Sequence, residues 1–298
     1  MSEAEVLVLG GGGWHWKRLE AAFACRGVRA ARLAFDSCGL AADGPGGVRL
    51  GTLRALPRLI VVRAMPPGSF EQVTLRLGVL HALAALGVRV ANEAAAIERC
   101  VDKSATGFHL ARAGVPSPPA WTVETEAAAR LLAEEARAAG HALVLKPLFG
   151  NQGKGLRLVR AAADLPPPEA VAGVYHLQRF IGRETGWHDW RVLVAGGEPV
   201  AAMVRHGKGW ITNIRQGARP EPHEAGGELG EAAVAAAAAV GAAYAGVDLM
   251  RDPEGRLQVL EVNSMPAWQG LQSVTGFDIA GRLADRLLAG LGQRAAAA

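Results

Sequence analysis

A hairpin-like segment near the C-terminal end carries three side chains that could hold a metal ion. Residues 247–263 read as two apolar strands joined by the turn sequence Asp-Pro-Glu-Gly. A four-residue turn would set Asp248 opposite Val259, and the alternation of side chains would then bring Asp248, Glu261 and Asn263 to one face. Two carboxylates and an amide oxygen are hard ligands of the kind that Mg²⁺ prefers. The pattern predicts a magnesium site, with the solvated face of an ordinary hairpin as the alternative.

A second segment combines a lysine with a glycine-rich loop. The apolar run Leu-Val-Leu-Lys-Pro ends at Lys146, and the loop Gly-Asn-Gln-Gly-Lys-Gly over residues 150–155 leads into another strand. Glycine backbone can approach phosphates closely and offer N–H donors, while lysine supplies positive charge. No Ser or Thr follows Lys154 and no helix follows the loop, which excludes a Walker A loop. The segment predicts phosphate binding, with a glycine hairpin that carries incidental lysines as the alternative.

A third segment is the glycine run after the first apolar strand. Gly10 and Gly12 fit two positions of a dinucleotide-binding fingerprint, and Asp36 ends the second predicted strand, where a ribose-binding acid belongs. However, the third glycine of that fingerprint falls at His15. A tight strand-to-helix turn is therefore the favoured interpretation, and a dinucleotide-dependent oxidoreductase stays open as a different class of function.

The elements that must position these groups alternate between strand and helix in the first part of the chain. Such alternation favours a parallel sheet with helices on its faces. The expected strands are 6–9, 28–35, 59–63 and 88–92, and the expected helices are 14–27 and 70–87.

Proline-rich stretches at 116–119 and 166–168 divide the remainder, and strands dominate after residue 174. Three units are predicted, at 1–97, 98–173 and 174–298. Their further expected elements are helices at 94–114, 125–140 and 231–246 and strands at 120–123, 142–146, 156–160, 175–180, 190–195 and 200–205.

Composition narrows the classes of function. The chain has 298 residues, half of them hydrophobic, and a net charge of +4. Its basic residues are mostly arginines spread singly along the chain, which argues against nucleic-acid binding because such a surface needs clustered charge. No stretch reads as a membrane span or signal peptide, and the three cysteines have no metal-like spacing. A cytoplasmic location, without membrane or nucleic-acid partners, is predicted.

The order of motifs along nearly the whole chain resembles the ATP-grasp fold, and within it the RimK-like amino-acid ligases. The segments that carry the resemblance are Asp102-Lys103, Lys146, Gln152-Gly153, Leu177-Gln178, Asp189-Trp190-Arg191, Ala245-Gly246-Val247-Asp248, Glu261-Val262-Asn263-Ser264-x-Pro266 and Thr275-Gly276-x-Asp278-Ile279-Ala280-Gly281. The resemblance implies an α/β (α+β) architecture. An N-terminal parallel-sheet domain (1–97) would precede a central lid subdomain (98–173) and a C-terminal antiparallel-sheet subdomain with the magnesium site (174–298).

The resemblance also implies roles for individual residues. Lys103 and Lys146 would contact the phosphates of ATP under a lid made by the glycine loop, and Asp189 would take the ribose. The whole cofactor-binding set is Lys103, Lys146, Gln152, Gly153, Lys154, Gln178, Arg179, Phe180, Asp189 and Asn213. Asp248, Glu261 and Asn263 would hold Mg²⁺, which Mn²⁺ could replace. Arg205 would act catalytically by neutralising the negative charge of the acyl phosphate and of the later oxyanion. Arg63 and Arg215 would bind substrate carboxylates.

The activity implied is an ATP-dependent joining of a carboxylate to an amine through an acyl phosphate. Most members of this family attach L-glutamate. The segment Lys-Pro-Leu-Phe-Gly at 146–150 resembles members that glutamylate coenzymes such as tetrahydromethanopterin, so a small carboxylate acceptor is expected. Glutamylation of a protein C-terminus, ligation to an amino-group carrier protein and a non-catalytic ATP sensor remain alternatives. The resemblance also implies a homo-oligomer, because members of the family commonly form dimers or tetramers.

Overall fold

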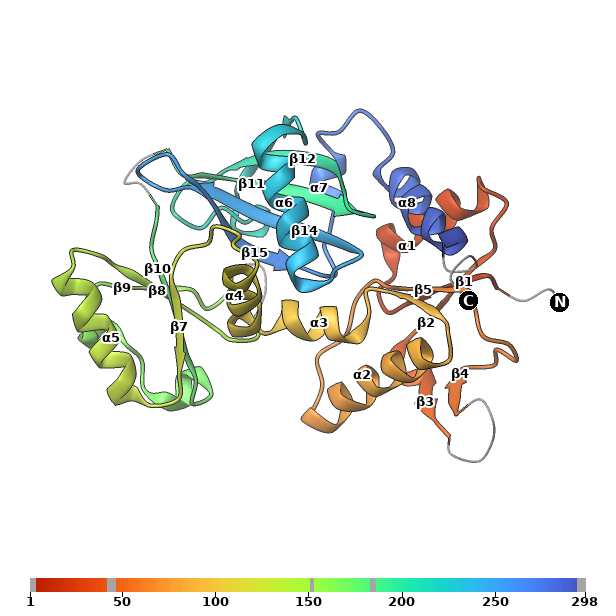
Figure 1. Cartoon of the computed structure of the whole chain (residues 1–298), viewed down its shortest axis with the longest axis horizontal. Helices are drawn as coiled ribbons and strands as arrows, with labels where there is room; N and C mark the ends of the chain where they lie inside the picture. Colours follow the sequence, from red (N-terminus) through yellow and green to blue (C-terminus); the bar gives the residue numbers. More distant parts are fainter. Residues whose placement is uncertain (1–3, 42–46, 151–152, 183–185, 294–298) are drawn as a thin grey trace.

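The computed structural model describes residues 4–41, 47–150, 153–182 and 186–293. Within this part of the chain the strands form three main sheets, which follow one another along the sequence (Figure 1). A separate two-stranded ribbon of β3 (Cys38–Leu40) and β4 (Val48–Leu50) was not expected from the sequence. Four short 3-10 helices are η1 (Phe35–Ser37), η2 (Ala162–Asp164), η3 (Pro168–Val171) and η4 (Ile214–Gln216).

The N-terminal sheet is parallel, as the alternating pattern predicts, with the order β2-β1-β5-β6. Its strands are β1 (Val6–Leu9), β2 (Ala30–Leu33), β5 (Leu59–Val62) and β6 (Arg89–Ala91). Val6 and Val8 of β1 pack toward α1 (Gly13–Ala24), while Leu7 and Leu9 pack toward α2 (Phe70–Ala85). Helices therefore cover both faces, which explains why β1 and β5 are uninterrupted apolar runs.

The helical stretch predicted as one element at 94–114 is in fact two helices, and this corrects the prediction. Helix α3 (Ala94–Val101) ends at Asp102, and α4 (Lys103–Arg112) starts immediately after it. The Asp102 carboxylate accepts hydrogen bonds from the backbone N–H groups of Ser104 and Ala105, at 2.8 and 3.3 Å. Aspartate is a strong N-cap because its oxygen satisfies the free donors of a first turn. The break thus sets Lys103 at a helix N-terminus.

The central sheet is antiparallel, with the order β7-β10-β8-β9. Its elements are β7 (Ala120–Val123), α5 (Glu126–Ala138), β8 (Leu143–Lys146), β9 (Arg157–Val159) and β10 (Tyr175–Arg179). Apolar residues of α5 and of β8 and β10 share one buried cluster. The glycine-rich loop therefore connects two hairpin strands, β8 and β9, at an edge of this sheet.

The C-terminal sheet is also antiparallel, with the order β13-β12-β11-β14-β15. Its strands are β11 (His188–Ala195), β12 (Glu198–His206), β13 (Arg219–His223), β14 (Tyr244–Arg251) and β15 (Leu257–Asn263). The alanine-rich helix α6 (Gly227–Val240) covers one face. It was predicted at 231–246, but Gly241 stops it in the left-handed region at φ +73°, and β14 begins at Tyr244.

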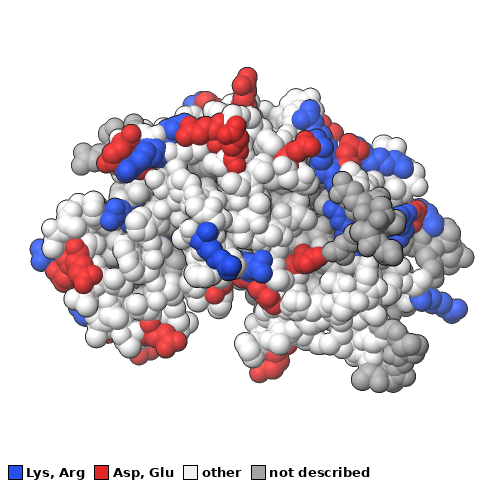
Figure 2. Space-filling model, in the orientation of Figure 1, with Lys and Arg blue, Asp and Glu red and all other residues white. Residues whose placement is uncertain are grey.

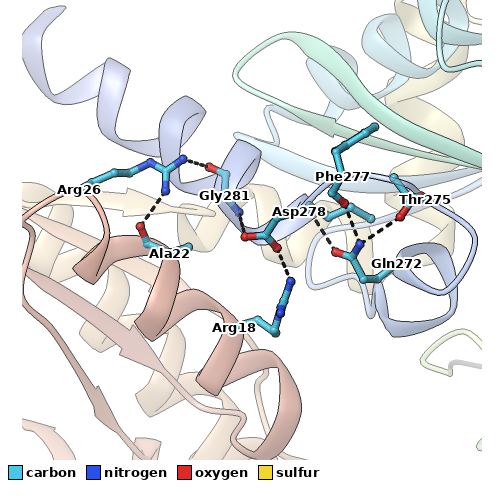
Figure 3. A network of polar contacts seen from close by, with 9 residues as sticks. Arg18, Ala22, Arg26, Gln272, Thr275, Phe277, Asp278 and Gly281 are labelled. Atoms are coloured by element: carbon cyan, nitrogen blue, oxygen red, sulfur yellow. Dashed lines mark hydrogen bonds and ion pairs between the residues drawn. The ribbon is translucent and has the colours of Figure 1, made fainter.

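The last helix returns to the N-terminal sheet. Helix α8 (Ile279–Gln293) follows the single turn of α7 (Gln269–Gln272) and packs against α1. Polar contacts reinforce this packing: Arg18 pairs with Asp278 at 2.7 Å, and Arg26 donates to the Gly281 carbonyl at 2.8 Å (Figure 3). The N-terminal and C-terminal sheets are therefore joined through a shared helical layer.

The distribution of charged side chains on the surface agrees with the scattered arginines of the sequence. On the face in Figure 2, acidic and basic side chains are interspersed, and they form no broad basic patch there. Among the described residues, no helix is both long and apolar enough to cross a bilayer.

Candidate active site

A cleft that is open to solvent lies between the central and C-terminal sheets. Twelve of the residues singled out in the sequence line it: Lys103, Lys146, Gly153, Lys154, Gln178, Arg179, Phe180, Asp189, Arg205, Asn213, Asp248 and Glu261. They come from α4, from strands of both sheets and from the loops that hold Gly153, Phe180 and Asn213. Gln152 lies outside the described residues.

The acidic hairpin reaches its expected arrangement through an unexpected register. Arg251 pairs with Leu257, so the turn is one residue longer than predicted, and Asp248 pairs with Glu261 rather than with Val259. A bulge between Asp248 and Leu249 accommodates the extra residue. Directly opposite residues of an antiparallel pair share a face, so the two carboxylates still project to the same side. The predicted register is wrong, but the predicted juxtaposition of Asp248 and Glu261 is correct.

Asp248 also belongs to a row of alternating charges across the sheet. Arg191 lies directly opposite Asp248 on β11, and its Nε and Nη2 donate to the two carboxylate oxygens, both at 2.6 Å. Arg205 of β12 lies opposite Asp189 and donates to it through Nε at 2.7 Å and through Nη2. Arg205 Nη2 also contacts Asp248 at 3.0 Å. Two buried carboxylates are thus neutralised by two arginines.

This pairing sets the protonation states of the row. Burial alone would raise the pKa of Asp248, but Arg191 and Arg205 together hold it at about 2. Burial would lower the pKa of Arg205, but Asp248 and Asp189 hold it above its ordinary value. Asp248 is therefore an ionised carboxylate near neutral pH, which is the form that binds cations.

Two lysines lie on the opposite wall. Lys146 ends β8, where burial lowers the pKa of its ammonium to about 8 despite the opposing influence of Glu261. Lys103 begins α4, and its Nζ donates to the Gly150 carbonyl at 3.1 Å, which ties the start of the glycine loop to that helix. Burial lowers the pKa of Lys103 as well. Positive charge that is only partly balanced by Glu261 suits an anionic ligand such as a phosphate chain.

The described part of the glycine loop lies against the C-terminal sheet. A side chain at Gly153 would lie 2.4 Å from Asn213 Oδ1, and Gly153 has a left-handed φ of +70°. Only glycine tolerates both conditions without strain. The loop and the segment around Asn213 therefore close one wall of the cleft together.

An aromatic cluster lies at the far end of the cleft. The Phe180 ring meets Trp210 edge-on at 5.9 Å and Trp187 at 6.1 Å. The N–H groups of Arg179 and Phe180 already donate to the carbonyls of Pro119 and Ala142. An adenine contact through the backbone of these two residues would therefore use their carbonyl oxygens.

Three sequence-predicted residues do not line the cleft. The amide oxygen of Asn263 accepts a hydrogen bond from the Met265 N–H at 3.2 Å. Arg215 is exposed in η4. Arg63 is 6% exposed and follows β5, in the N-terminal sheet.

Sequence reasoning gave Arg191 no role, although Arg191 belongs to a segment that carries the family resemblance, and it did not assign Trp210 to the site. Arg191 is two residues after Asp189, so the period of a strand places both on the same face, and this signal was available. Trp210 stands in the glycine-containing segment Gly-Lys-Gly-Trp, which has no periodic pattern that could place it.

The glycine run after β1 has a packing role. A side chain at Gly10 would lie 1.7 Å from the Ala64 carbonyl oxygen, so the turn requires a glycine there. Asp36 lies in η1, beyond the end of β2. These observations fit the strand-to-helix turn that the sequence favoured.

Comparison with known proteins agrees with this geometry. Residues 101–287 match the model of the RimK-like ATP-grasp domain. The tetrahydromethanopterin:alpha-L-glutamate ligase of Methanococcus maripaludis is 36% identical over 208 residues, which cover 67% of this chain and 70% of the relative. A probable alpha-L-glutamate ligase of Thioalkalivibrio sulfidiphilus is 35% identical over 231 residues, covering 72% and 75% of the two chains.

Solved structures share the fold over almost the whole length. The ATP-grasp ligase PsnB, in complex with a phosphomimetic variant of its minimal precursor, Mg and ADP, aligns with a TM-score of 0.76 at 22% identity, covering 97% of this chain and 99% of PsnB. D-cycloserine synthetase DcsG aligns with a TM-score of 0.70 at 19% identity, covering 96% and 99%. The predicted fold class and the predicted ligase class are confirmed. The chain belongs to the RimK-like ATP-grasp family of ligases.

Proposed function

We propose that this chain is an ATP- and Mg²⁺-dependent ligase that adds L-glutamate to a carboxylate of a small coenzyme, such as a pterin of the tetrahydromethanopterin type. The observation that carries the proposal is one cleft in which Lys103 and Lys146 lie opposite Asp248 and Glu261. Lysines suit the phosphates of ATP, and carboxylates suit the cation that accompanies them. The relatives named as glutamate ligases support the choice of amino acid, and those named as tetrahydromethanopterin ligases support the choice of acceptor.

The side chains present fit a magnesium ion. Glu261 lies directly opposite Asp248, and in the described chain no hydrogen bond or ion pair engages its carboxylate. Asp248 is ionised, and both residues offer the hard oxygen atoms that Mg²⁺ prefers. Glu261 and Asp248 would hold the ion, with Asn263 as a further predicted ligand; Mn²⁺ could replace it. When bound, the metal neutralises phosphate charge.

The first half-reaction transfers the γ-phosphoryl group to a substrate carboxylate. One oxygen of the acceptor carboxylate attacks the γ-phosphorus, the bond to the β-phosphate oxygen breaks, and ADP and an acyl phosphate form. Lys103 and Lys146 hold the phosphates in line and offset their charge, so that positioning and electrostatics do most of the work. Asp189 remains the predicted ribose ligand, although its oxygens also accept from Arg205.

The second half-reaction forms the amide. The glutamate amine attacks the acyl carbon, a tetrahedral oxyanion develops, and phosphate leaves as the proton of the amine is lost. Nε and Nη2 of Arg205 donate to Asp189 and Asp248, whereas Nη1 has no partner among the described residues. That nitrogen is the group we assign to the developing charge. Because Arg205 is fixed by two carboxylates, it is already oriented before the reaction, which is what electrostatic catalysis requires.

The test is ADP release with Mg-ATP and each of the 20 amino acids, against a panel of reduced pterin coenzymes, small carboxylates and acidic peptides. We expect release only when L-glutamate and a pterin are both present, with a product that is heavier by one glutamyl residue in mass spectrometry. Release with a peptide and no pterin would overturn the acceptor assignment. ATP binding without release under any pairing would overturn the ligase assignment in favour of a sensor.

A further inference from the structure

A second group of polar side chains lies where the N-terminal sheet meets the C-terminal sheet, away from the nucleotide cleft. Arg63 follows β5, and its guanidinium lies 4.8 Å from the ring centre of Trp268. The His15 ring lies 4.6 Å from the same indole, and His15 Nε2 accepts a hydrogen bond from the Trp268 backbone N–H at 3.2 Å. In these three residues, the Arg63 cluster, Trp268 is more than 200 residues away in sequence from both His15 and Arg63.

This cluster has donors without acceptors. Nε and Nη1 of Arg63 and the indole Nε1 of Trp268 are buried, and none has a hydrogen-bond partner among the described residues. The Tyr244 side chain also contacts Arg63. Burial and the charge of Arg63 lower the pKa of His15 to about 4, so its ring is neutral, and because Nε2 accepts, its proton is on Nδ1. Buried donors without partners are costly, and in native proteins they usually have a reason.

The cluster also borders an open helix N-terminus. Helix α1 begins at Gly13, and its N-cap, Gly12, contributes no side-chain hydrogen bond to the first turn. A side chain at Gly11 would lie 3.0 Å from Arg63 Cγ, so the Arg63 side chain runs directly beneath this turn. Arg32 lies on the other side, with Nη1 donating to the Gly11 carbonyl at 3.0 Å. Free helical N–H groups and two arginines make this end of the sheet strongly favourable for an anion.

The position in the fold agrees with a ligand site. Arg63 follows β5 and the glycine turn follows β1, two neighbouring parallel strands whose outer neighbours, β6 and β2, lie on opposite sides. Ligands of open parallel sheets bind at such a switch point, beyond the carboxyl ends of the strands. Tyr244 contacts Arg63, and Asp248 lies four residues further along β14, or about 13 Å at the rise of a strand.

We propose that Arg63, the first turn of α1 and the Trp268 indole together bind a carboxylate of one of the two substrates. This inference rests on the proposed ligase function, since it names the place where a substrate is held next to the reacting centre. The guanidinium fork and the N–H groups match a carboxylate, and the flat face of Trp268 keeps the arginine in place. The carboxylate belongs either to the incoming L-glutamate or to the acceptor, and the experiment separates these sources.

The experiment compares Arg63→Met and Arg63→Lys with the wild type. Arg58→Met serves as the matched control, because Arg58 is exposed at the opposite end of the same strand. Melting temperatures are measured with and without L-glutamate or glutarate, in the presence of Mg²⁺ and a non-hydrolysable ATP analogue. Values of KM for ATP, L-glutamate and the acceptor are then measured by ADP release.

We expect R63M to raise KM for one carboxylate substrate about tenfold or more, which corresponds to a lost charge-assisted hydrogen bond. KM for ATP should change less than about twofold. For the carboxylate substrate, R63K should have a KM between those of the wild type and R63M, because lysine keeps the positive charge but lacks the two-pronged guanidinium. A rise confined to L-glutamate assigns the site to the amino acid, and a rise confined to the acceptor assigns it to the coenzyme. R63M should also melt no lower than the wild type, since an unpartnered buried charge is removed.

The inference is overturned if R63M leaves both carboxylate KM values within about twofold, or if it lowers the melting temperature and ATP binding together, as a purely structural residue would. Failure of the proposed function is distinguishable, because it would abolish ADP release by the wild type itself. In that case a carboxylate-dependent rise in the melting temperature of the wild type and of R58M, absent in R63M, would still support the site. No such rise in the wild type would overturn it.

Discussion

The nucleotide cleft and the Arg63 cluster are both rich in arginine, yet their charges are arranged in opposite ways. In the cleft, Arg191 and Arg205 are charge-paired with Asp248 and Asp189, although Nη1 of Arg205 has no partner in the described chain. At the cluster, two nitrogens of Arg63 have no partner in the described chain. Removing a paired charge leaves its partner buried and uncompensated, whereas removing an unpaired one relieves a cost. The difference indicates that the cleft is built before substrates arrive, and that the cluster is completed by one of them.

The largest effect is expected at Glu261. Glu261→Gln keeps the shape of the side chain but removes the charge that we assign to the metal. Turnover should fall about 10³-fold, because charge neutralisation on the phosphates is lost. The free energy of unfolding should change much less than turnover does, since among the described residues no ion pair engages Glu261. ADP release and urea unfolding measure the two quantities.

The matched control for Glu261 is Glu254→Gln, in the turn of the same hairpin. Glu254 is exposed, and among the described residues its carboxylate pairs with Arg256 alone. Its turnover should stay within about twofold of the wild type. Full activity of E261Q would contradict the assignment of Glu261 to the metal.

The next largest effect is on stability at Arg205. Arg205→Met leaves Asp189 buried without its partner, so the free energy of unfolding should fall by about 3–5 kcal/mol. The double variant with Asp189→Asn should recover part of this loss, because it removes the orphaned charge. Urea unfolding of the wild type, of R205M and of the double variant measures these free energies. If R205M and R63M shifted stability in the same direction and by similar amounts, the contrast between the two regions would be wrong.

A smaller effect concerns pH and Lys146, whose pKa is about 8 against an ordinary 10.5. Above pH 8 the ammonium of the ATP-free protein loses its proton, so ATP affinity should fall by up to about tenfold per pH unit. Stability should change in the other direction: between pH 8 and 10.5 the unfolded chain binds the proton and the folded chain does not, so the free energy of unfolding rises with pH. Both slopes should be absent in Lys146→Met.

Lys17→Met is the control for these pH profiles, because Lys17 is exposed on α1. It should keep the slopes of the wild type in titrations of ATP binding and in urea unfolding at each pH. A flat affinity profile in the wild type would contradict a direct role of the Lys146 charge in holding phosphate.

The smallest effect is expected at the break between α3 and α4. Asp102→Ala removes the N-cap that accepts from Ser104 and Ala105, which should lower the free energy of unfolding by about 1 kcal/mol. Because Lys103 is the first residue of α4, KM for ATP should rise by a few-fold while kcat changes less. Asp102→Asn keeps a capping oxygen and should restore both values. Equal behaviour of the two variants would show that the cap does not position Lys103.

The order of the candidate site residues along the chain was predictable from the sequence alone. A lysine at the end of an apolar strand, a glycine loop and a hairpin with two acids are local patterns, because strand periodicity and turn residues act over a few positions. They identified Lys146, the loop residues Gly153 and Lys154, and the acids Asp248 and Glu261. The resemblance to the ATP-grasp fold supplied the other seven of the twelve residues that the structure brings to one cleft. The strands β1 and β7 were predicted to the residue from local patterns.

Other features depended on contacts between distant segments. The turn after Arg251 is one residue longer than its sequence suggests. A bulge next to Asp248 then brings Glu261 opposite Asp248, so that the two carboxylates share a face as expected, which local patterns could not predict. The ends of the helix before β14 were misplaced because an alanine-rich run has propensity for helix throughout, and Gly241 decides where it stops.

The sequence by itself therefore determined the order of the candidate site residues along the chain, partly from short-range patterns and partly from the resemblance of the motif order to a known family. Only the tertiary structure decided which charges are neutralised and which are left open. Arg205 meets Asp189 and Asp248, whereas Arg63 meets an indole, a tyrosine and the start of a helix. The sequence alone does not show whether an arginine is paired with a carboxylate or left without a partner. What it can bind is set by the partners that folding brings to it and by how much water folding removes.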